Sequence, residues 1–195
     1  MPEKRKSTRA HKKTHDAAAK RERERMVPRD VVPEGALSPL DDLEDFELAD
    51  GVPDVTGWDV VDANGRRVGD VHTILVDTAA GAPRYLDIEV DHAVMDTDDD
   101  RHLLIPVGCA RVDAQDDRIQ VTTLEADALA GTPLYDHRPV TREFEQSVRR
   151  CHSARLADAP PAEEDFYASQ MYDARRFWAD RGVDWERPLV VRRAD

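Results

Sequence analysis

The chain has 195 residues, of which 40% are hydrophobic and 35% are charged, and its formal net charge at pH 7 is −13. Globular proteins carry about 25% charged residues, so we expect a modest core with polar extensions. A membrane-spanning helix needs about 20 mostly apolar residues, whereas the longest stretch without Asp, Glu, Lys or Arg is the nine residues from His102 to Ala110. These numbers exclude a transmembrane helix and predict a soluble, cytoplasmic protein.

The charge is divided unevenly along the chain. Residues 1–25 contain ten Lys or Arg and four Asp or Glu, a balance of +6, whereas the rest contains 18 and 37, a balance of −19. Residues 1–27 have no apolar periodicity, which predicts a disordered basic arm. Such an arm can make weak contacts with nucleic acid or with an anionic membrane surface, at the periphery of the inner membrane. The alternative is a tail that only keeps an acidic protein soluble.

Residues 28–54 form a Pro-rich and acidic connector. Pro28, Pro33 and Pro39 disfavour regular structure in its first part. Its acidic second part also carries a few apolar side chains, which we expect to hold it against the following domain: Leu43, Phe46 and Leu48.

From Val55 the pattern changes to short strands separated by turn residues. The predicted strands span residues 57–62, 67–77, 84–91, 101–107, 110–113 and 118–123. Asn64-Gly65 is a strong hairpin signal between the first two, and Gly69 marks the place where the long second strand bends. Because a small sheet must close or stack to bury its apolar face, we predict an all-β fold with a small β-barrel over residues 55–136.

Residues 137–195 are predicted to form a partly helical, aromatic-containing C-terminal extension. The two predicted helices span residues 141–156 and 163–182. On the second helix Tyr167, Met171 and Trp178 share one face. This stripe either packs over the barrel and completes its core, or it forms a docking surface for a partner or for a second copy in a homo-oligomer.

No pattern of catalytic residues is recognisable. The two cysteines, Cys109 and Cys151, are not in a C-x-x-C pair. His11 and His15 are four residues apart, but they lie in the arm predicted to be disordered, and the other histidines lack the helical spacing of a metal motif. The seven histidines are His11, His15, His72, His92, His102, His137 and His152. We therefore predict a non-enzymatic protein with no catalytic residues, no cofactor and no metal site, which acts by binding a protein partner.

The order of the strand sequences resembles the PRC-barrel domain over residues 55–136. The pieces that carry the resemblance are Val68-Gly69, Arg84-Tyr85-Leu86 followed by an acid, and Leu104-Ile105-Pro106-Val107-Gly108. This domain forms the cytoplasmic part of the photosynthetic reaction-centre H subunit. It also occurs in a ribosome maturation factor and in stand-alone bacterial proteins.

The resemblance implies an interaction or adaptor module, with a possible association with the light reactions and electron transfer. The alternative is a ribosome- or RNA-associated maturation factor built on the same barrel. In the H subunit an acidic residue after Arg-Tyr-Leu lies near the quinone, and the matching residue here is Asp87. By strand alternation, with Leu86, Ile88 and Val90 facing the core, we expect Asp87 to point outward and to be solvated.

Overall fold

The computed structural model describes residues 37–96, 99–113, 116–153, 163–179, 183 and 188–193. The predicted basic arm, residues 1–27, lies outside the described residues. The strands are β1 (Leu37–Pro39), β2 (Phe46–Leu48), β3 (Asp59–Val61), β4 (Arg67–Asp77), β5 (Ala82–Val90), β6 (Arg101–Pro106), β7 (Ala110–Asp113), β8 (Arg118–Val121), β9 (Leu134–Tyr135) and β10 (Val190–Arg192). The helices are α2 (His92–Met95), α3 (Arg142–Ser153) and α4 (Ala174–Phe177), with short 3-10 helices at Leu40–Asp42, Val107–Cys109, Ala126–Gly131, Glu163–Ala168 and Gln170–Tyr172.

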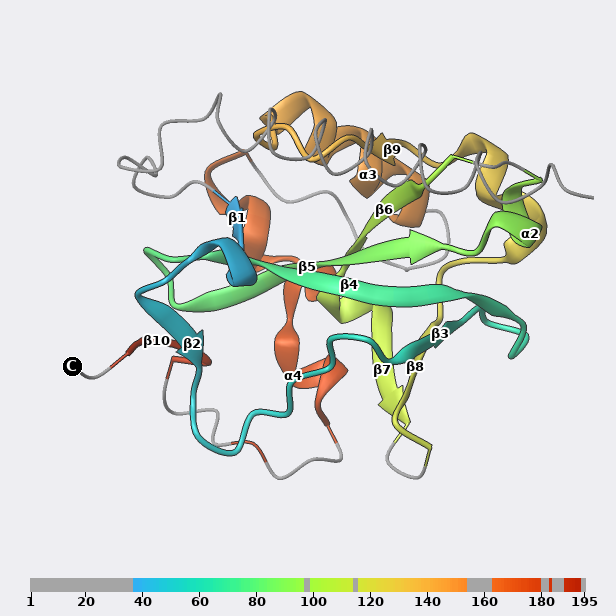
Figure 1. The fold of residues 1–195 in the computed structure, drawn as a ribbon. Helices are drawn as coiled ribbons and strands as arrows, with labels where there is room; N and C mark the ends of the chain where they lie inside the picture. The colour runs from blue at the N-terminus through green and yellow to red at the C-terminus, as the bar shows by residue number, and fades with distance from the viewer. Residues whose placement is uncertain are drawn as a thin grey trace, which may run out of the picture. The chain divides into compact units, whose positions relative to one another are not determined.

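The fold is mostly β, as the sequence predicts, and its main sheet has the strand order β7-β8-β3-β4-β5-β6-β9, with β1 paired to β4 (Figure 1). The long antiparallel pair of β4 and β5 forms its centre, and β3 pairs with β8 in parallel. Within the described residues no ladder joins the end strands β7 and β9, so the predicted closure of a barrel is not seen. Helix α4 packs against β7 at one end of this path.

Gly69 is needed because β4 and β5 approach each other closely. A Cβ at this position would lie 2.0 Å from the carbonyl oxygen of Glu89 and 2.9 Å from the Cα of Val90, both backbone atoms of the neighbouring strand. From the sequence, Gly69 is interpreted as the place where the strand bends. The structure adds a second reason: only a residue without a side chain fits where the backbones of β4 and β5 come this close.

We therefore expect Gly69→Ala to lower the free energy of unfolding by about 1–3 kcal/mol or more, because backbone atoms of a central strand would have to move. Chemical denaturation monitored by circular dichroism measures this loss. The matched control is Gly131→Ala, where an added Cβ meets nothing within 4 Å. Equal stability of the two variants would contradict the steric explanation.

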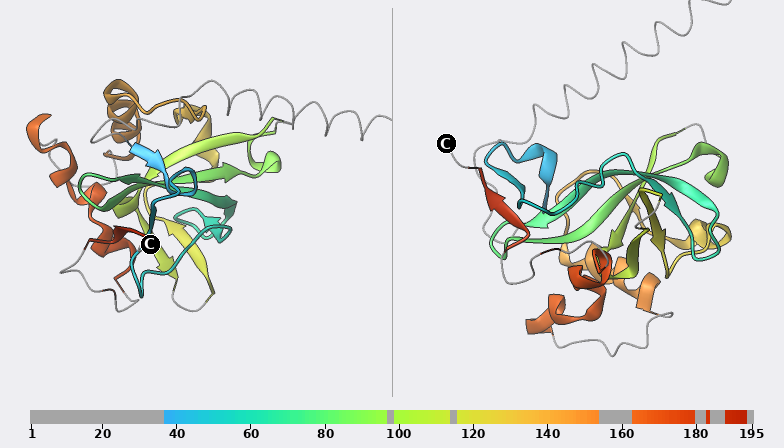
Figure 2. Two further views of the ribbon diagram at one scale, coloured as in Figure 1. Left: turned by 60° about the vertical axis from the view of Figure 1, so that its left-hand side comes forward. Right: turned by 90° about the horizontal axis from the view of Figure 1, so that it is seen from below.

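The C-terminal extension packs on the sheet through two separate helices (Figure 2). Helix α3 contacts β6, whereas α4 contacts β5, β7 and the turn at Val107–Cys109. Trp178 and Met171 of the extension are 0% exposed. Of the two predicted roles of the aromatic stripe, completion of the core therefore applies to these residues, while Tyr167 stays partly exposed.

The predicted helix over residues 163–182 is replaced by short helical pieces. Ser169 and Asp173 separate them, and each side chain caps the piece that follows. The Oγ of Ser169 accepts a hydrogen bond from the amide of Met171 at 3.3 Å, and Oδ1 of Asp173 accepts one from the amide of Arg175 at 3.0 Å. These residues favour helix starts over helix interiors, because their side chains replace backbone acceptors.

Four short strands lie outside the predicted set: β1, β2, β9 and β10. β1 forms although it ends in Pro39, which lacks a backbone donor and fits the end of a strand. β2 belongs to the connector and pairs with β10, near the end of the chain, in a separate two-stranded sheet. Leu43, Phe46 and Leu48 are partly buried against the core, as expected.

Candidate polar site around Asp87

Asp87 is fully buried, which corrects the expectation that it is solvated. Its strand β5 is covered on both faces, so alternation does not separate buried from exposed positions here. Tyr85 and Asp87 lie on the same face of β5. Tyr85 is hydrogen-bonded to Glu145 of α3, and Asp87 forms an ion pair with His137, which follows β9. Sequence periodicity reports one covered face of a strand and cannot reveal a second one supplied by distant segments.

Three segments, β4, β6 and the turn after β9, bring histidines to this buried carboxylate. Asp87 pairs with Leu104 and Glu89 pairs with His102, so the side chains of Asp87 and His102 are diagonal neighbours on one face of the β5–β6 ladder. His72 lies at a shift of register in β4, between the pairs Val71–Ile88 and Thr73–Asp87. Irregularities of this kind redirect a side chain within a strand.

His137 completes the group from the turn after β9. Its φ of 60° lies in the left-handed region, which histidine adopts more readily than most residues. The rings of His137 and His102 pack edge to face, with centroids 4.2 Å apart and planes at 73°. The ring of Tyr135 also packs against His137, with centroids 5.0 Å apart.

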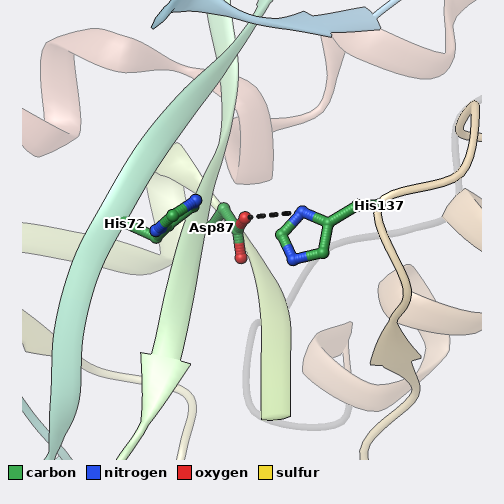
Figure 3. Close-up of side chains that lie close together, drawn as sticks. All are labelled: His72, Asp87 and His137. Atoms are coloured by element: carbon green, nitrogen blue, oxygen red, sulfur yellow. Dashed lines mark ion pairs between the residues drawn. The ribbon is translucent and has the colours of Figure 1, made fainter. Parts of the chain in front are cut away.

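The two carboxylate oxygens of Asp87 contact two different histidines, of which Figure 3 draws His137. Oδ1 of Asp87 is hydrogen-bonded to Nδ1 of His102 at 2.9 Å. Oδ2 lies 3.7 Å from Nδ1 of His137, which is an ion-pair distance, and this buried oxygen has no hydrogen-bond partner among the described residues. One nitrogen of His72, one of His137 and an oxygen of Asp87 lie within 4.8 Å of one another.

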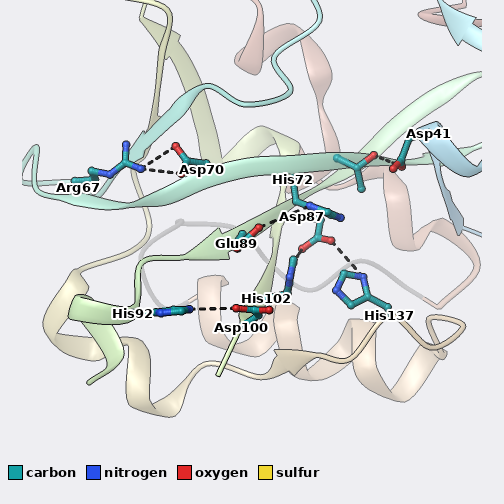
Figure 4. A network of polar contacts seen from close by, with 11 residues as sticks. Asp41, Arg67, Asp70, His72, Asp87, Glu89, His92, Asp100, His102 and His137 are labelled. Atoms are coloured by element: carbon teal, nitrogen blue, oxygen red, sulfur yellow. Dashed lines mark hydrogen bonds and ion pairs between the residues drawn. The ribbon is translucent and has the colours of Figure 1, made fainter. Parts of the chain in front are cut away.

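The surroundings of the site are acidic (Figure 4). Oε2 of Glu89 lies 3.9 Å from Nδ1 of His72, and Asp41 accepts a hydrogen bond from the Thr73 hydroxyl at 2.6 Å. Burial raises the pKa of Tyr135, and the negative charges of Asp87, Asp42, Asp136 and Asp41 raise it further. The site is therefore suited to hold positive charge, either as protons on imidazoles or as a cation.

The same surroundings separate the pKa values of two histidines. Burial alone lowers the pKa of His102, but its hydrogen bond to Asp87 and nearby carboxylates outweigh burial and raise the pKa above the ordinary 6.5. Burial also lowers the pKa of His137, and there it outweighs the attraction of Asp87, with repulsion from His102 and His72 adding to the effect.

In protein freed of metal by a chelator, we therefore expect His102 to keep its ring proton to higher pH than His137. Assigned two-dimensional NMR spectra of the imidazole rings between pH 5 and 9 measure both titrations, with His137→Gln as the control for assignment. In Asp87→Asn the pKa of His102 should fall, because its main negative partner is gone. If His137 titrated at the higher pH, the assigned charge distribution would be wrong.

A second buried polar cluster joins the C-terminal extension to β5. The hydroxyls of Tyr85 and Tyr167 both donate to Oε1 of Glu145, the former at 3.0 Å, and Arg142 pairs with Oε2 at 3.1 Å. Tyr85 also lies 3.0 Å from the hydroxyl of Tyr172. Burial raises the pKa of Glu145 although these contacts favour its charged form. Both carboxylate oxygens have partners, so this cluster serves to hold the fold.

Of the site residues, only Asp87 was singled out by sequence. His72, His102 and His137 are 15 to 50 residues from it in the chain, counting from Asp87 in the printed sequence. The predicted strands could have placed His102 beside Asp87 had the register of that hairpin been known. Neither the shift of register at His72 nor the path of the turn that carries His137 has a signal in the sequence.

Comparison with known families identifies the central part of the chain. Residues 49–128 match the family model of the PRC-barrel domain. The match includes β3 to β8, and hence His72, Asp87 and His102, whereas His137 lies beyond it. Among the described residues no helix is both long enough and apolar enough to cross a membrane. The resemblance inferred from the strand sequences is confirmed: the chain contains a PRC-barrel domain at residues 49–128.

Proposed function

We propose that this protein is a non-enzymatic adaptor that uses its PRC-barrel domain to bind another protein. The observation that carries the proposal is the match of residues 49–128 to this domain, which suggests a protein-interaction module. The proposal takes the sheet of this region as a small PRC-type barrel with the C-terminal extension packed on it.

Charge favours a protein over nucleic acid as the partner of the folded part. Residues 26–195 carry 18 basic and 37 acidic side chains. A balance of −19 repels phosphate backbones and attracts basic protein surfaces. We therefore expect the partner to present a basic surface.

The finer proposal is a role like that of the cytoplasmic domain of the reaction-centre H subunit, in the cytoplasm or at the surface of the inner membrane. The sequence resemblance at Arg84-Tyr85-Leu86-Asp87 supports this role. A ribosome- or RNA-associated role is the second candidate. It is supported by the balance of +6 in residues 1–25, which can contact phosphates through counterion release.

Affinity capture from native lysate tests these roles. The full chain and a chain without residues 1–25 are each used as bait at low and at high salt. Bound proteins are identified by mass spectrometry, and bound nucleic acid and lipid are measured in parallel. We expect a protein that is retained at high salt by both baits, since it binds the folded part.

The other outcomes separate the candidates. Reaction-centre subunits and pigment among the captured species would support the light-reaction role, and ribosomal proteins with RNA would support the second candidate. Capture of nucleic acid or lipid alone, lost at high salt and lost without residues 1–25, would contradict the adaptor proposal.

A further inference from the structure

The geometry points to a site for a divalent transition-metal ion formed by His72, Asp87 and His137. This inference goes beyond the adaptor function and does not depend on it. It also departs from the expectation of no metal site, which rested on the lack of a motif along the sequence. The ligands come from β4, β5 and the turn after β9. Because these segments are separate in the chain, the ligands do not form a short sequence motif.

The three side chains offer the right donors for such an ion. Two imidazole nitrogens and one carboxylate oxygen form the ligand set of many zinc and iron sites. Their atoms already lie within 4.8 Å of one another. Tetrahedral ligands about 2.1 Å from an ion are about 3.4 Å apart. To coordinate one ion, the three ligand atoms must therefore approach one another by about an ångström. The side chains of His72 and His137 are half-exposed and are able to make this movement.

The buried carboxylate supplies an independent observation. The side chain of Asp87 is 0% exposed. Within the part of the chain that the structure describes, its Oδ2 has no hydrogen-bond partner, and it forms an ion pair with His137 at 3.7 Å. A buried carboxylate oxygen in this state is costly unless a positive group satisfies it. Oδ2 faces the space between the two histidines (Figure 3), where an ion would contact all three side chains.

His102 acts as a positioning residue for this site. It is 8% exposed and holds Oδ1 of Asp87 at 2.9 Å, which fixes the carboxylate and leaves Oδ2 for the ion. Outer partners of this kind commonly orient metal ligands. The side chains of His72 and His137 are 39% and 42% exposed, so a bound ion would also reach solvent and keep a coordination position for water.

The test is a calorimetric titration of the full chain with Zn²⁺, after removal of metal by a chelator and then of the chelator itself. We expect one ion to bind at this site, and we expect H72Q and H137Q each to weaken binding about tenfold or more. The matched control is H92Q. His92 is also a half-exposed histidine paired with a carboxylate, Asp100 at 3.2 Å, but it lies outside the cluster. The Zn²⁺ affinity of H92Q should therefore stay within about twofold of the wild-type value.

Two further measurements keep the result unambiguous. His11 and His15 are four residues apart in the sequence, so each titration is repeated in an H11Q/H15Q background, where the site should persist. Co²⁺ absorption spectra report the coordination geometry of the bound ion, and circular dichroism verifies that each variant is folded. Unchanged affinity in both H72Q and H137Q, binding that requires His11 and His15, or no binding at about 100 µM Zn²⁺ would overturn the inference.

Discussion

Replacing Asp62 with alanine should lower the free energy of unfolding by about 3–5 kcal/mol, because it removes a buried charge that several donors share. Oδ1 accepts hydrogen bonds from the amides of Asn64 and Arg66 at 2.8 and 2.9 Å. Oδ2 accepts one from the amide of Ala126 at 3.0 Å and pairs with the Arg66 guanidinium at 3.1 Å. One carboxylate thus holds the β3–β4 turn and fastens it to the segment after β8.

The control for this variant is Asp127→Ala. Asp127 pairs with the same arginine at 2.9 Å, but its side chain is 84% exposed. Exposed ion pairs contribute about 0–1 kcal/mol, so this variant should be nearly as stable as the wild type. Urea denaturation at pH 7 compares the two. A similar loss in both would mean that Arg66, and not the buried carboxylate, holds the turn.

The effect of Asp62 should also depend on pH. Burial raises the pKa of this carboxyl, but the hydrogen bonds from Ala126, Arg66 and Asn64 outweigh burial and lower the pKa below the ordinary 3.8. A lowered pKa means that this stabilisation is complete above the unfolded-state value and is lost as pH falls through the folded-state value. The difference in stability between wild type and Asp62→Asn should therefore shrink below about pH 4. A constant difference between pH 7 and 3 would contradict the assigned cause.

Gly108→Ala should separate the C-terminal extension from the sheet, at a cost of at least about 3 kcal/mol. A Cβ at this position would lie 2.0 Å from the carbonyl oxygen of Gln170 and 2.8 Å from the carbonyl carbon of Met171. These are backbone atoms, so relief requires the segment with Met171, Phe177 and Trp178 to lift. Burial of each such side chain is worth about 1.5–3 kcal/mol.

The displacement is measured as a red shift of Trp178 fluorescence, in a W58F/W185F background that leaves one tryptophan. The comparison variant is Arg176→Ala, which removes the hydrogen bond from Nε to the carbonyl oxygen of Gly108 at 3.3 Å without adding an atom. It should cost about 1 kcal/mol or less and leave the emission unchanged. A Gly108→Ala protein with wild-type emission and stability would show that the extension adapts without lifting.

Local patterns along the chain predict much of the sheet. The bounds of β4 and β7 agree with the predicted strands at 67–77 and 110–113. β4 is rich in β-branched side chains and is framed by turn residues, which makes it the clearer case. Helix α3 lies within the predicted helix over residues 141–156. Features that depend on a few neighbouring residues were thus accessible.

Features that depend on distant segments could not be predicted from the sequence. β2 has three residues and forms only because β10 is present, more than 140 residues later. The burial of Asp87 requires the turn that carries His137, and alternation in β5 gave the opposite expectation. The interrupted helix after residue 163 was misjudged because apolar spacing was given more weight than the capping preferences of Ser169 and Asp173.

The pairing of β2 with β10 joins the segment just before the PRC-barrel domain to a segment near the end of the chain. Leu48 lies opposite Val190, and the amide of Ala49 donates to the carbonyl oxygen of Leu189 at 3.0 Å. Two points far apart in the chain are therefore neighbours, which is the arrangement that suits circular permutation. The amide of Arg193 also donates to the carbonyl oxygen of Asp45 at 2.9 Å. A linker from residue 193 to the start of β1 would join these neighbouring segments covalently, and new ends could then be opened in a surface loop.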